Sequence, residues 1–374
     1  MRLRDYFPLG IAFNDAFCNR KKEIGVLIKN IQNGKHTLLI ATRRYGKSSL
    51  ALRALKLSNL PYVERDFYMA RNEKIIESYI LTAVVDLIGK ALGPIDKLIA
   101  SIKSYVKHLK PKLEIGSSAL KLELTTDLET DPATNVKEGL LLLERLLAEK
   151  QKQVVLLMDE FQEVGVIAQG KGIEAAIRHV AQQTRYITFI FSGSNRKLLK
   201  TMFEDETRPL YKLCWKLPLQ RIATAEYSVH LQKAAKSAWN QLLEEVVVQK
   251  ILSLTERHPF YVNKLCDRLW TYYSKPPSIT EVEKVWLEIA AEEKSDAVKE
   301  ISLLSMGQKN VLLEIAKNVE HLTGKKTILA LQMSSSSIIT ALEGLEEKDV
   351  IERVDDQYQI INPVVKFYVL KSLS

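Results

Sequence analysis

The chain has 374 residues, of which 46% are hydrophobic and 26% are charged. This is the balance of a globular protein long enough for two or three domains. Its first ten residues lack the apolar core of a signal peptide, and no apolar run reaches the length of a membrane span. These features argue against a secreted or membrane-spanning protein, so we expect a cytoplasmic protein with no membrane partner.

The net charge of +9 is unevenly distributed. Residues 1–150 hold 25 Lys and Arg against 17 Asp and Glu, whereas residues 305–374 hold 8 against 9. Any nucleic-acid contact is therefore expected in the N-terminal part. The three cysteines, Cys18, Cys214 and Cys266, are too widely separated to form a metal-spaced pair, which indicates reduced thiols.

The first two elements are an arm and a helix. Residues 1–16 are irregular and rich in aromatic side chains, and we expect them to pack as an N-terminal arm. A helix is expected after Asn19, its predicted N-cap residue, because apolar side chains recur at helical spacing at Leu27, Ile28 and Ile31.

Residues 37–49 have the pattern of a strand, a loop and a helix. An apolar, β-branched run ends in a loop, and Gly46-Lys47-Ser48-Ser49 stands where the helix begins. In this context GK[ST] predicts a P-loop, whose backbone N–H groups bind phosphate at the helix N-terminus. Lys47 is expected to reach the β- and γ-phosphates of ATP, and the Ser48 hydroxyl to bind Mg²⁺.

One position departs from the pattern GxxxxGK[ST]. Ala41 stands where the first glycine is expected. Its Cβ could tighten the turn or crowd a triphosphate, because glycine is the default where backbone approaches a ligand closely. The alternative is an ordinary turn between a strand and a helix that carries a surface lysine.

Five elements are expected before the next buried strand. They are a strand at 62–68, a helix at 73–92, a basic amphipathic helix at 95–109, a hairpin at 113–124, and a helix at 136–150 capped by Asn135. A basic amphipathic helix can meet nucleic acid or a membrane surface. We favour the simpler interpretation, in which it packs on its own domain and exposes a charged face.

A second motif follows at the end of the next strand. Residues 154–158 are uniformly apolar and lead into Asp159-Glu160. Charge at the edge of a core is costly unless it has a partner, and a magnesium-bound nucleotide supplies one. Asp159 is expected to hold the metal through water, and Glu160 to polarise the attacking water. The alternative is a strand that reaches solvent in an acidic turn.

Three segments resemble the prokaryotic (archaeal-type) P-loop ATPase family of the AAA+/STAND group. The first is an aromatic residue followed by NR..E and a helix, at residues 17–31. The second is ATRRYGKSSL at 41–50, which is similar to GxRRxGK[ST]SL. The third is Phe203 with Arg208-Pro209-Leu210-Tyr211, which is similar to the F…RPLY segment of the family.

This resemblance implies roles for residues outside the P-loop. Asn19 and Arg20 would lie beside the adenine, and Arg43 and Arg44 would be the characteristic arginine pair, for which two solvated loop cations are the alternative. Pro259 corresponds to the GxP or GHP position of the helical lid, where Arg257 replaces the glycine. The nucleotide-binding residues are expected to be Asn19, Arg20, Arg43, Arg44, Tyr45, Gly46, Lys47, Ser48, Ser49 and Pro259.

The family also places a polar sensor at the end of the strand between the P-loop strand and the Asp-Glu strand. That strand is expected at 186–191, with Ser194 and Asn195 as candidates and Ser192 as a further possibility. Arg208 would be an arginine finger reaching a neighbouring protomer. The alternative is an ion pair with the nearby carboxylates of Glu204, Asp205 or Glu206. The expected catalytic residues are Lys47, Glu160, Ser194, Asn195 and Arg208, and the expected metal ligands are Ser48 and Asp159.

The fold class implied is an α/β parallel-sheet P-loop NTPase core of AAA+ type at 1–222, an all-α lid at 223–304 and a winged helix at 305–374. In the winged helix, helices are expected at 308–317, 327–332 and 337–348, before a hairpin. This segment has a net charge of −1, and binding to B-DNA needs several phosphate-neutralising cations. We therefore interpret it as a packing or regulatory module.

Three functions remain open. The first is an ATPase switch that requires ATP and Mg²⁺ and acts on a protein partner or through self-association. The second is a DNA-handling ATPase that uses the basic N-terminal half. The third is a nucleotide-binding scaffold that does not hydrolyse ATP, which Ala41 favours and Glu160 opposes.

Overall fold

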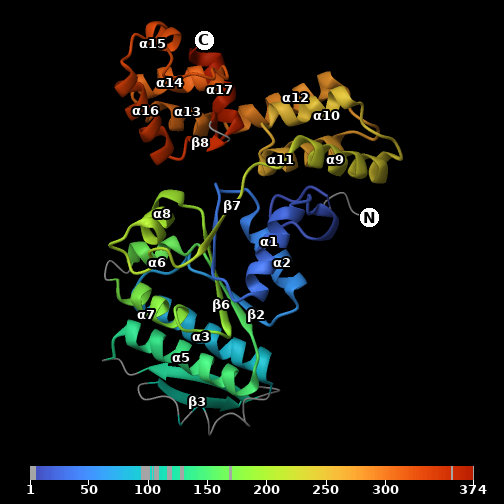
Figure 1. Ribbon diagram of the computed structural model, residues 1–374. Helices are drawn as coiled ribbons and strands as arrows, with labels where there is room; N and C mark the ends of the chain where they lie inside the picture. The colour runs from blue at the N-terminus through green and yellow to red at the C-terminus, as the bar shows by residue number, and fades with distance from the viewer. Residues whose placement is uncertain are drawn as a thin grey trace. The chain divides into compact units, whose positions relative to one another are not determined.

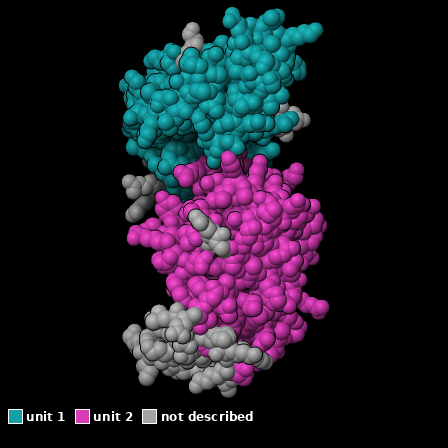
Figure 2. Space-filling view, turned by 90° about the vertical axis from the view of Figure 1, so that its left-hand side faces the viewer, with its two compact units in different colours: residues 1–19, 44–46, 220–374 teal, residues 20–43, 47–219 magenta. Residues whose placement is uncertain are grey.

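The computed structural model describes residues 6–93, 102, 104, 109–115, 120–126, 130–167, 171–354 and 357–373. The chain forms two compact units, drawn in different colours in Figure 2. Unit 1 comprises residues 1–19, 44–46 and 220–374, and unit 2 comprises residues 20–43 and 47–219. The P-loop is therefore divided, because its middle three residues group with unit 1 and its two ends with unit 2.

Unit 2 is built on a five-stranded parallel sheet with the order β2-β5-β6-β1-β7. The strands are β1 (Thr37–Ile40), β2 (Tyr62–Asp66), β5 (Val154–Asp159), β6 (Ile187–Gly193) and β7 (Trp215–Pro218). The P-loop strand β1 lies between β6 and β7, and β6 separates it from β5. This order confirms the expected position of the sensor strand.

Helices cover both faces of this sheet, as parallel strands require. Figure 1 shows α1 (Lys21–Gln32) and α2 (Lys47–Ser58) together on one face, with α3 (Glu73–Leu92), α5 (Pro132–Lys150) and α7 (Gly172–Ala181) on the other. The shorter helices α6 (Gln162–Ile167) and α8 (Arg196–Glu204) follow β5 and β6. Strand β5 is buried at every position, which explains its uninterrupted apolar sequence.

The expected hairpin in unit 2 is present as β3 (Leu109–Ile115) and β4 (Leu120–Thr126). It lies beside α3 and α5, and Leu109 and Leu124 join their apolar core. Most of the basic helix expected at 95–109 lies outside the described residues. Two helix starts differ from prediction. Asp131, not Asn135, caps α5, and Arg20, not Asn19, precedes α1, without a side-chain cap hydrogen bond.

The physical reason for both errors is tertiary. Asn135 lies inside α5, fully buried, where its Nδ2 donates to the Glu77 carboxylate at 2.9 Å. Asn19 and Arg20 both have positive φ angles of 44° and 55°, so the chain turns sharply before the helix begins. A side chain's preference for caps does not reveal either arrangement.

Unit 1 contains helices and a small hairpin. The helices expected at 225–300 are α9 (Thr224–Trp239), α10 (Glu245–Leu254), α11 (Pro259–Tyr272), α12 (Ile279–Glu292) and α13 (Lys294–Ser302). The winged helix follows as α14 (Met306–Ala316), α15 (Lys325–Leu331), α16 (Ser335–Glu347), β8 (Ile351–Val354), β9 (Gln357–Ile360) and α17 (Pro363–Leu373). The arm carries a 3-10 turn, η2 (Asn14–Ala16).

One apolar core runs through unit 1 and includes side chains of the lid helices, of the winged helix and of Tyr6 and Phe7 from the arm. The two parts of the chain that we expected to be separate domains therefore share a core, and the three-domain division stays a prediction. Among the described residues, no helix is by itself long and apolar enough to cross a membrane, although one bent pair, α15 with α16, meets the criterion by length and composition.

Candidate functional site: the P-loop and the carboxyl edge of the sheet

The P-loop turns through two left-handed residues. Arg44 has φ +64° and Gly46 has φ +82°, and α2 begins at Lys47. Ala41 has no positive φ, so its backbone does not require glycine. The ammonium group of Lys47 donates to the carbonyls of Ala41 at 3.2 Å and of Thr42 at 3.4 Å. The Lys47 side chain therefore folds back onto the first residues of the loop.

Asp159 contacts the P-loop helix. It ends β5 and is largely buried, and its Oδ2 accepts a hydrogen bond from the Ser48 hydroxyl at 2.8 Å. Its Oδ1 accepts from the Ser192 hydroxyl at 2.5 Å and from the Glu160 backbone N–H at 3.0 Å. Hydroxyl and carboxylate oxygens are the hard ligands that Mg²⁺ prefers, so Ser48 and Asp159 fit the metal predicted for them.

Glu160 is held at a fixed position beyond the strand end. Its backbone is left-handed, with φ +47°. Its Oε2 accepts from the Ser194 hydroxyl at 2.8 Å, from the Ser194 N–H at 3.2 Å and from the Gln162 amide at 2.6 Å. A carboxylate positioned by three donors is suited to orient a water molecule, because its own rotation is restricted.

Four carboxylates gather where β2 and β5 end. Asp66 pairs in register with Asp159, and Glu64 lies two residues earlier on β2. Burial raises the pKa of Asp66, and the negative charges of Asp159 and Glu160 raise it further. Burial likewise raises the pKa of Glu64, with the charges of Asp159 and Asp66 adding to the effect. The ionised forms of Glu64 and Asp66 are therefore disfavoured at this edge of the sheet, and a bound cation would stabilise them.

The three sensor candidates have different contacts. Ser194 bonds to Glu160, and Ser192 bonds to Asp159. Asn195 instead caps α8, because its side chain accepts from the Leu198 N–H at 3.0 Å. Among these candidates, Ser194 is therefore the one in contact with the predicted water-activating carboxylate.

The arginine pair of the P-loop is divided between the two units. In unit 2, the Arg43 Nε donates to the Ser194 hydroxyl at 3.4 Å. In unit 1, the Arg44 guanidinium lies 4.0 Å from the ring centre of Phe260 on α11, a cation–π contact. The two adjacent arginines therefore have different partners: Arg43 contacts the sensor candidate Ser194, and Arg44 contacts the lid residue Phe260.

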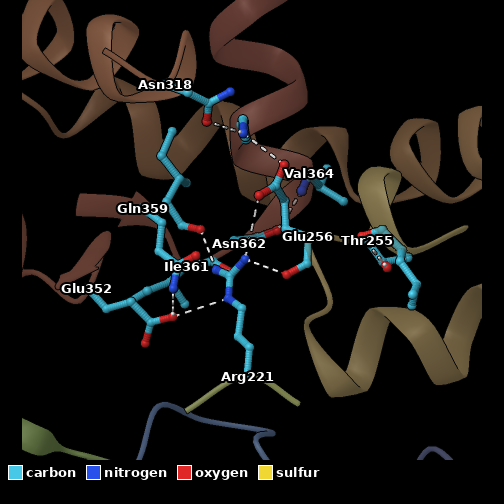
Figure 3. Close-up of polar contacts among 12 residues, drawn as sticks. Arg221, Thr255, Glu256, Asn318, Glu352, Gln359, Ile361, Asn362 and Val364 are labelled. Atoms are coloured by element: carbon cyan, nitrogen blue, oxygen red, sulfur yellow. Dashed lines mark hydrogen bonds and ion pairs between the residues drawn. The ribbon is translucent and has the colours of Figure 1, made fainter. Parts of the chain in front are cut away.

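The next residue, Tyr45, has its side chain in unit 1, where 1% of the residue is exposed. Its hydroxyl hydrogen-bonds to Glu352 of the winged helix and to Arg221, which precedes the lid. Figure 3 shows the Arg221 side chain extending toward Glu352, Ile361 and Glu256. We had expected Tyr45 to belong to the nucleotide site, and its backbone can still do so, but its side chain contacts protein groups.

The remaining nucleotide-binding candidates have mixed surroundings. Arg20 is buried and pairs with Glu23 at 3.0 Å. The Asn19 Oδ1 is buried and has no hydrogen-bond partner among the residues that the structure describes. Ser49 is buried at the start of α2. Pro259 is the first residue of α11, after a left-handed Arg257 with φ +56°, which explains why glycine occurs there in the resembling family.

Arg208 contacts a carboxylate that the sequence did not suggest. Its guanidinium forms an ion pair with Glu174 on α7, a residue with no exposed side-chain surface. The expected alternative partners at 204–206 were therefore wrong. The attraction of Arg208 opposes the effect of burial, which raises the pKa of Glu174. A role as an arginine finger would require this pair to separate, and that role stays a prediction.

Sequence reasoning missed Gln162 and the network around Arg221. Gln162 follows the Asp-Glu pair by two residues, a spacing that could have suggested a contact with Glu160. Gly193 gives it room, because a Cβ there would lie 1.9 Å from the Gln162 Oε1. Tyr45, an aromatic residue in a polar loop, was the available signal for the second contact.

These features define a class. A parallel sheet with β1 beside β6, a GK[ST] loop at the start of α2 and carboxylates at the end of β5 are the fold and the motif positions of P-loop NTPases. Residues 298–371 match a family model described as a probable winged helix domain. The chain therefore has a P-loop ATPase fold that ends in a winged helix, as the sequence predicted. No curated protein matches it.

Three of the solved structures that are similar to this chain come from Pyrococcus abyssi and Aeropyrum pernix. The Walker-type ATPase PABY2304 of Pyrococcus abyssi has a TM-score of 0.65 and 19% identity, over 99% of this chain and 100% of that one. The ORC2 protein of Aeropyrum pernix, with ADPNP and ADP, has a TM-score of 0.54 and 13% identity, over 98% and 96%. The ORC1 protein of the same organism, in complex with DNA, has a TM-score of 0.50 and 12% identity, over 100% and 97%.

Proposed function

We propose that this protein binds and hydrolyses ATP with Mg²⁺, and that it acts as a switch whose nucleotide state controls the arrangement of its domains and its binding to a protein partner or to itself. The backbone of the P-loop and Lys47 would hold the phosphates. Ser48 and Asp159 would hold the metal, which supplies charge neutralisation at the phosphates when it is bound.

The observation that carries this proposal is the pair of contacts at the end of β5. Asp159 accepts a hydrogen bond from the hydroxyl of the P-loop residue Ser48 at 2.8 Å, and the adjacent Glu160 accepts one from the hydroxyl of Ser194 at 2.8 Å. The metal-binding and water-activating roles are thus separated on neighbouring residues. Glu160 would orient the attacking water. Ser194 and Arg43 would change the position of Glu160 according to whether the γ-phosphate is present.

The test is phosphate release from ATP and Mg²⁺ by the purified protein, beside two variants. Lys47→Ala is expected to abolish nucleotide binding, because the loop loses the cation that pairs with the phosphates. Glu160→Gln is expected to keep binding and to lose hydrolysis. Unchanged turnover in Glu160→Gln would show that the assigned role of Glu160 is wrong. Binding without turnover in the unmodified protein would favour the non-hydrolysing scaffold.

A second candidate function is a DNA-handling ATPase. It is supported by the basic excess of residues 1–150 and by the likeness to the ORC1 protein that was solved in complex with DNA. The acidic balance of the winged helix opposes it. A fluorescence titration with duplex DNA at increasing salt separates the two functions, because phosphate contacts make affinity fall with salt concentration. Stimulation of phosphate release by DNA would favour this second candidate.

A further inference from the structure

The P-loop carries a side chain that is not needed to bind phosphate. Tyr45 lies two residues before Lys47, yet it is among the largest fully buried side chains of the protein. With Arg44 and Gly46 it groups with the lid and the winged helix rather than with the sheet. A polar phosphate-binding loop has no requirement for a buried tyrosine, so its contacts call for a separate explanation.

The Tyr45 hydroxyl has polar contacts with Glu352 and Arg221. It donates to the Glu352 Oε1 on β8 at 2.5 Å and accepts from the Arg221 Nε at 3.0 Å. Its ring also lies edge-on to His258, with the ring centres 4.8 Å apart. Burial raises the pKa of Tyr45, so the phenol keeps its proton and remains a donor. The loop is thereby joined to the wing through a specific hydrogen bond.

Arg221 fixes the other side of this contact. Its Nε also bonds to Glu352 at 3.2 Å, and its Nη2 donates to the carbonyls of Ile360 at 2.6 Å and Ile361 at 3.2 Å, at the end of the wing (Figure 3). Its Nη1 donates to the Glu256 carbonyl at 2.7 Å. With 2% of its side chain exposed, the guanidinium ties together both strands of the wing, the lid and Tyr45.

We propose that Tyr45, Glu352 and Arg221 form a latch through which the winged helix holds the P-loop, so that displacement of the wing frees the loop and speeds nucleotide exchange. Tyr45 is a positioning residue in this device. The inference rests on the proposed nucleotide binding, but the latch itself can be observed without nucleotide.

The coupling follows from chain connectivity. One residue, Gly46, separates Tyr45 from Lys47, and at φ +82° it adopts a conformation that turns the chain sharply. Movement of Tyr45 must therefore change the backbone around Lys47. Because coupling between two sites is reciprocal, a nucleotide that reorders the loop must also alter how firmly the wing is held.

Hydrogen exchange tests the latch in the nucleotide-free protein. Tyr45→Phe removes the hydroxyl and keeps the ring, and Glu352→Gln removes the charge and keeps the shape. Gln357→Ala is the control, since Gln357 is an exposed residue of the same hairpin. Both latch variants should speed exchange of the amides of residues 41–50 by about tenfold, within the usual range of coupling between sites, and the control should not.

A second measurement adds fluorescent ADP. Its dissociation rate should rise by about tenfold in both latch variants, and ADP should change exchange in β8 and β9 of the unmodified protein but not of Glu352→Gln. Unchanged loop exchange, or a uniform increase throughout α9 to α17, would overturn the latch and leave the network with a structural role alone. Failure of the unmodified protein to bind ADP would instead contradict the proposed function, while the nucleotide-free comparison still decides the latch.

Discussion

The carboxyl edge of the parallel sheet and the network around Arg221 are both rich in polar groups, but they balance negative charge in opposite ways. At the sheet edge, burial raises the pKa of Asp66, and the negative charges of Asp159 and Glu160 raise it further. In the network, Glu352 has a guanidinium 3.2 Å away and a phenol at 2.5 Å.

This difference indicates what each region is for. Like charges that face one another lower the stability of the fold, and clusters of this kind are typical of functional sites, where a bound ligand offsets the repulsion. A buried carboxylate that is fully paired instead fixes one arrangement of the chain. We therefore expect changes at the sheet edge to reduce activity more than stability, and changes in the network to reduce stability first.

The largest expected effect is at Glu160. Glu160→Gln should lower phosphate release by about 10²–10⁴-fold, the usual contribution of a positioned general base. The free energy of unfolding should change little, because the lost repulsion with Asp66 and the weakened hydrogen bonds from Ser194 and Gln162 have opposite effects. Urea unfolding and phosphate release measure the two quantities. Glu163→Gln, on the adjacent helix α6, is the matched control, and an equal loss of turnover in both variants would remove the special role of Glu160.

Arg221 provides the opposite case. Arg221→Met should lower the free energy of unfolding by about 3–5 kcal/mol, because it leaves the Glu352 charge buried without its guanidinium. The double variant Arg221→Met, Glu352→Met should recover most of this loss, since no uncompensated charge remains. Urea denaturation followed by circular dichroism measures both values. Additive losses in the double variant would contradict the assignment of the effect to the ion pair.

The lid adds a pH dependence. Burial, with the nearby charge of Arg221, lowers the pKa of His258 to about 3, whereas an unfolded histidine titrates near 6.5. Between these values the unfolded chain binds more protons, so the free energy of unfolding should fall as pH falls below about 6.5, by up to about 1.4 kcal/mol per pH unit. Above that pH the contribution of His258 is constant.

Urea unfolding at several pH values between 4 and 7 measures this slope. In His258→Gln the slope should be shallower by about the contribution of one proton, about 1.4 kcal/mol per pH unit. The titration of carboxylates is common to both proteins and cancels in the comparison. His230, whose pKa burial lowers to about 4, should contribute in the same direction and accounts for part of the slope that remains. Identical slopes would show that His258 is accessible to protons in the folded state.

The smallest effects distinguish two of the sensor candidates, Ser194 and Asn195. Asn195→Ala should lower the free energy of unfolding by about 1 kcal/mol, because α8 loses its cap, and should leave turnover unchanged. Ser194→Ala should lower turnover by about tenfold, because Glu160 loses one of the donors that orient it, and should also lower the free energy of unfolding, because a hydrogen bond to a charged group contributes about 1.5–3 kcal/mol. The reverse pattern would make Asn195 the sensor.

Helix caps and ion pairs show where prediction from the sequence failed. Asn135 has the chemistry of a cap residue, but tertiary structure uses it to pair with Glu77 inside α5. Arg208 has carboxylates close by in the sequence and pairs with Glu174 instead. In each case a local preference of about 1 kcal/mol was outweighed by burial, which requires polar groups to find partners wherever the fold brings them.

The sheet core and the winged helix could be predicted from the sequence, as could the positions of GK[ST] and of Asp159-Glu160 at a loop and a strand end, because each depends on periodicity or spacing within a short segment. Tertiary structure decided that Ser194 contacts Glu160, that Arg43 and Arg44 serve different units, and that Tyr45 meets Glu352 307 residues away in the chain. Such contacts depend on which elements become neighbours, and no local pattern in the chain records that choice.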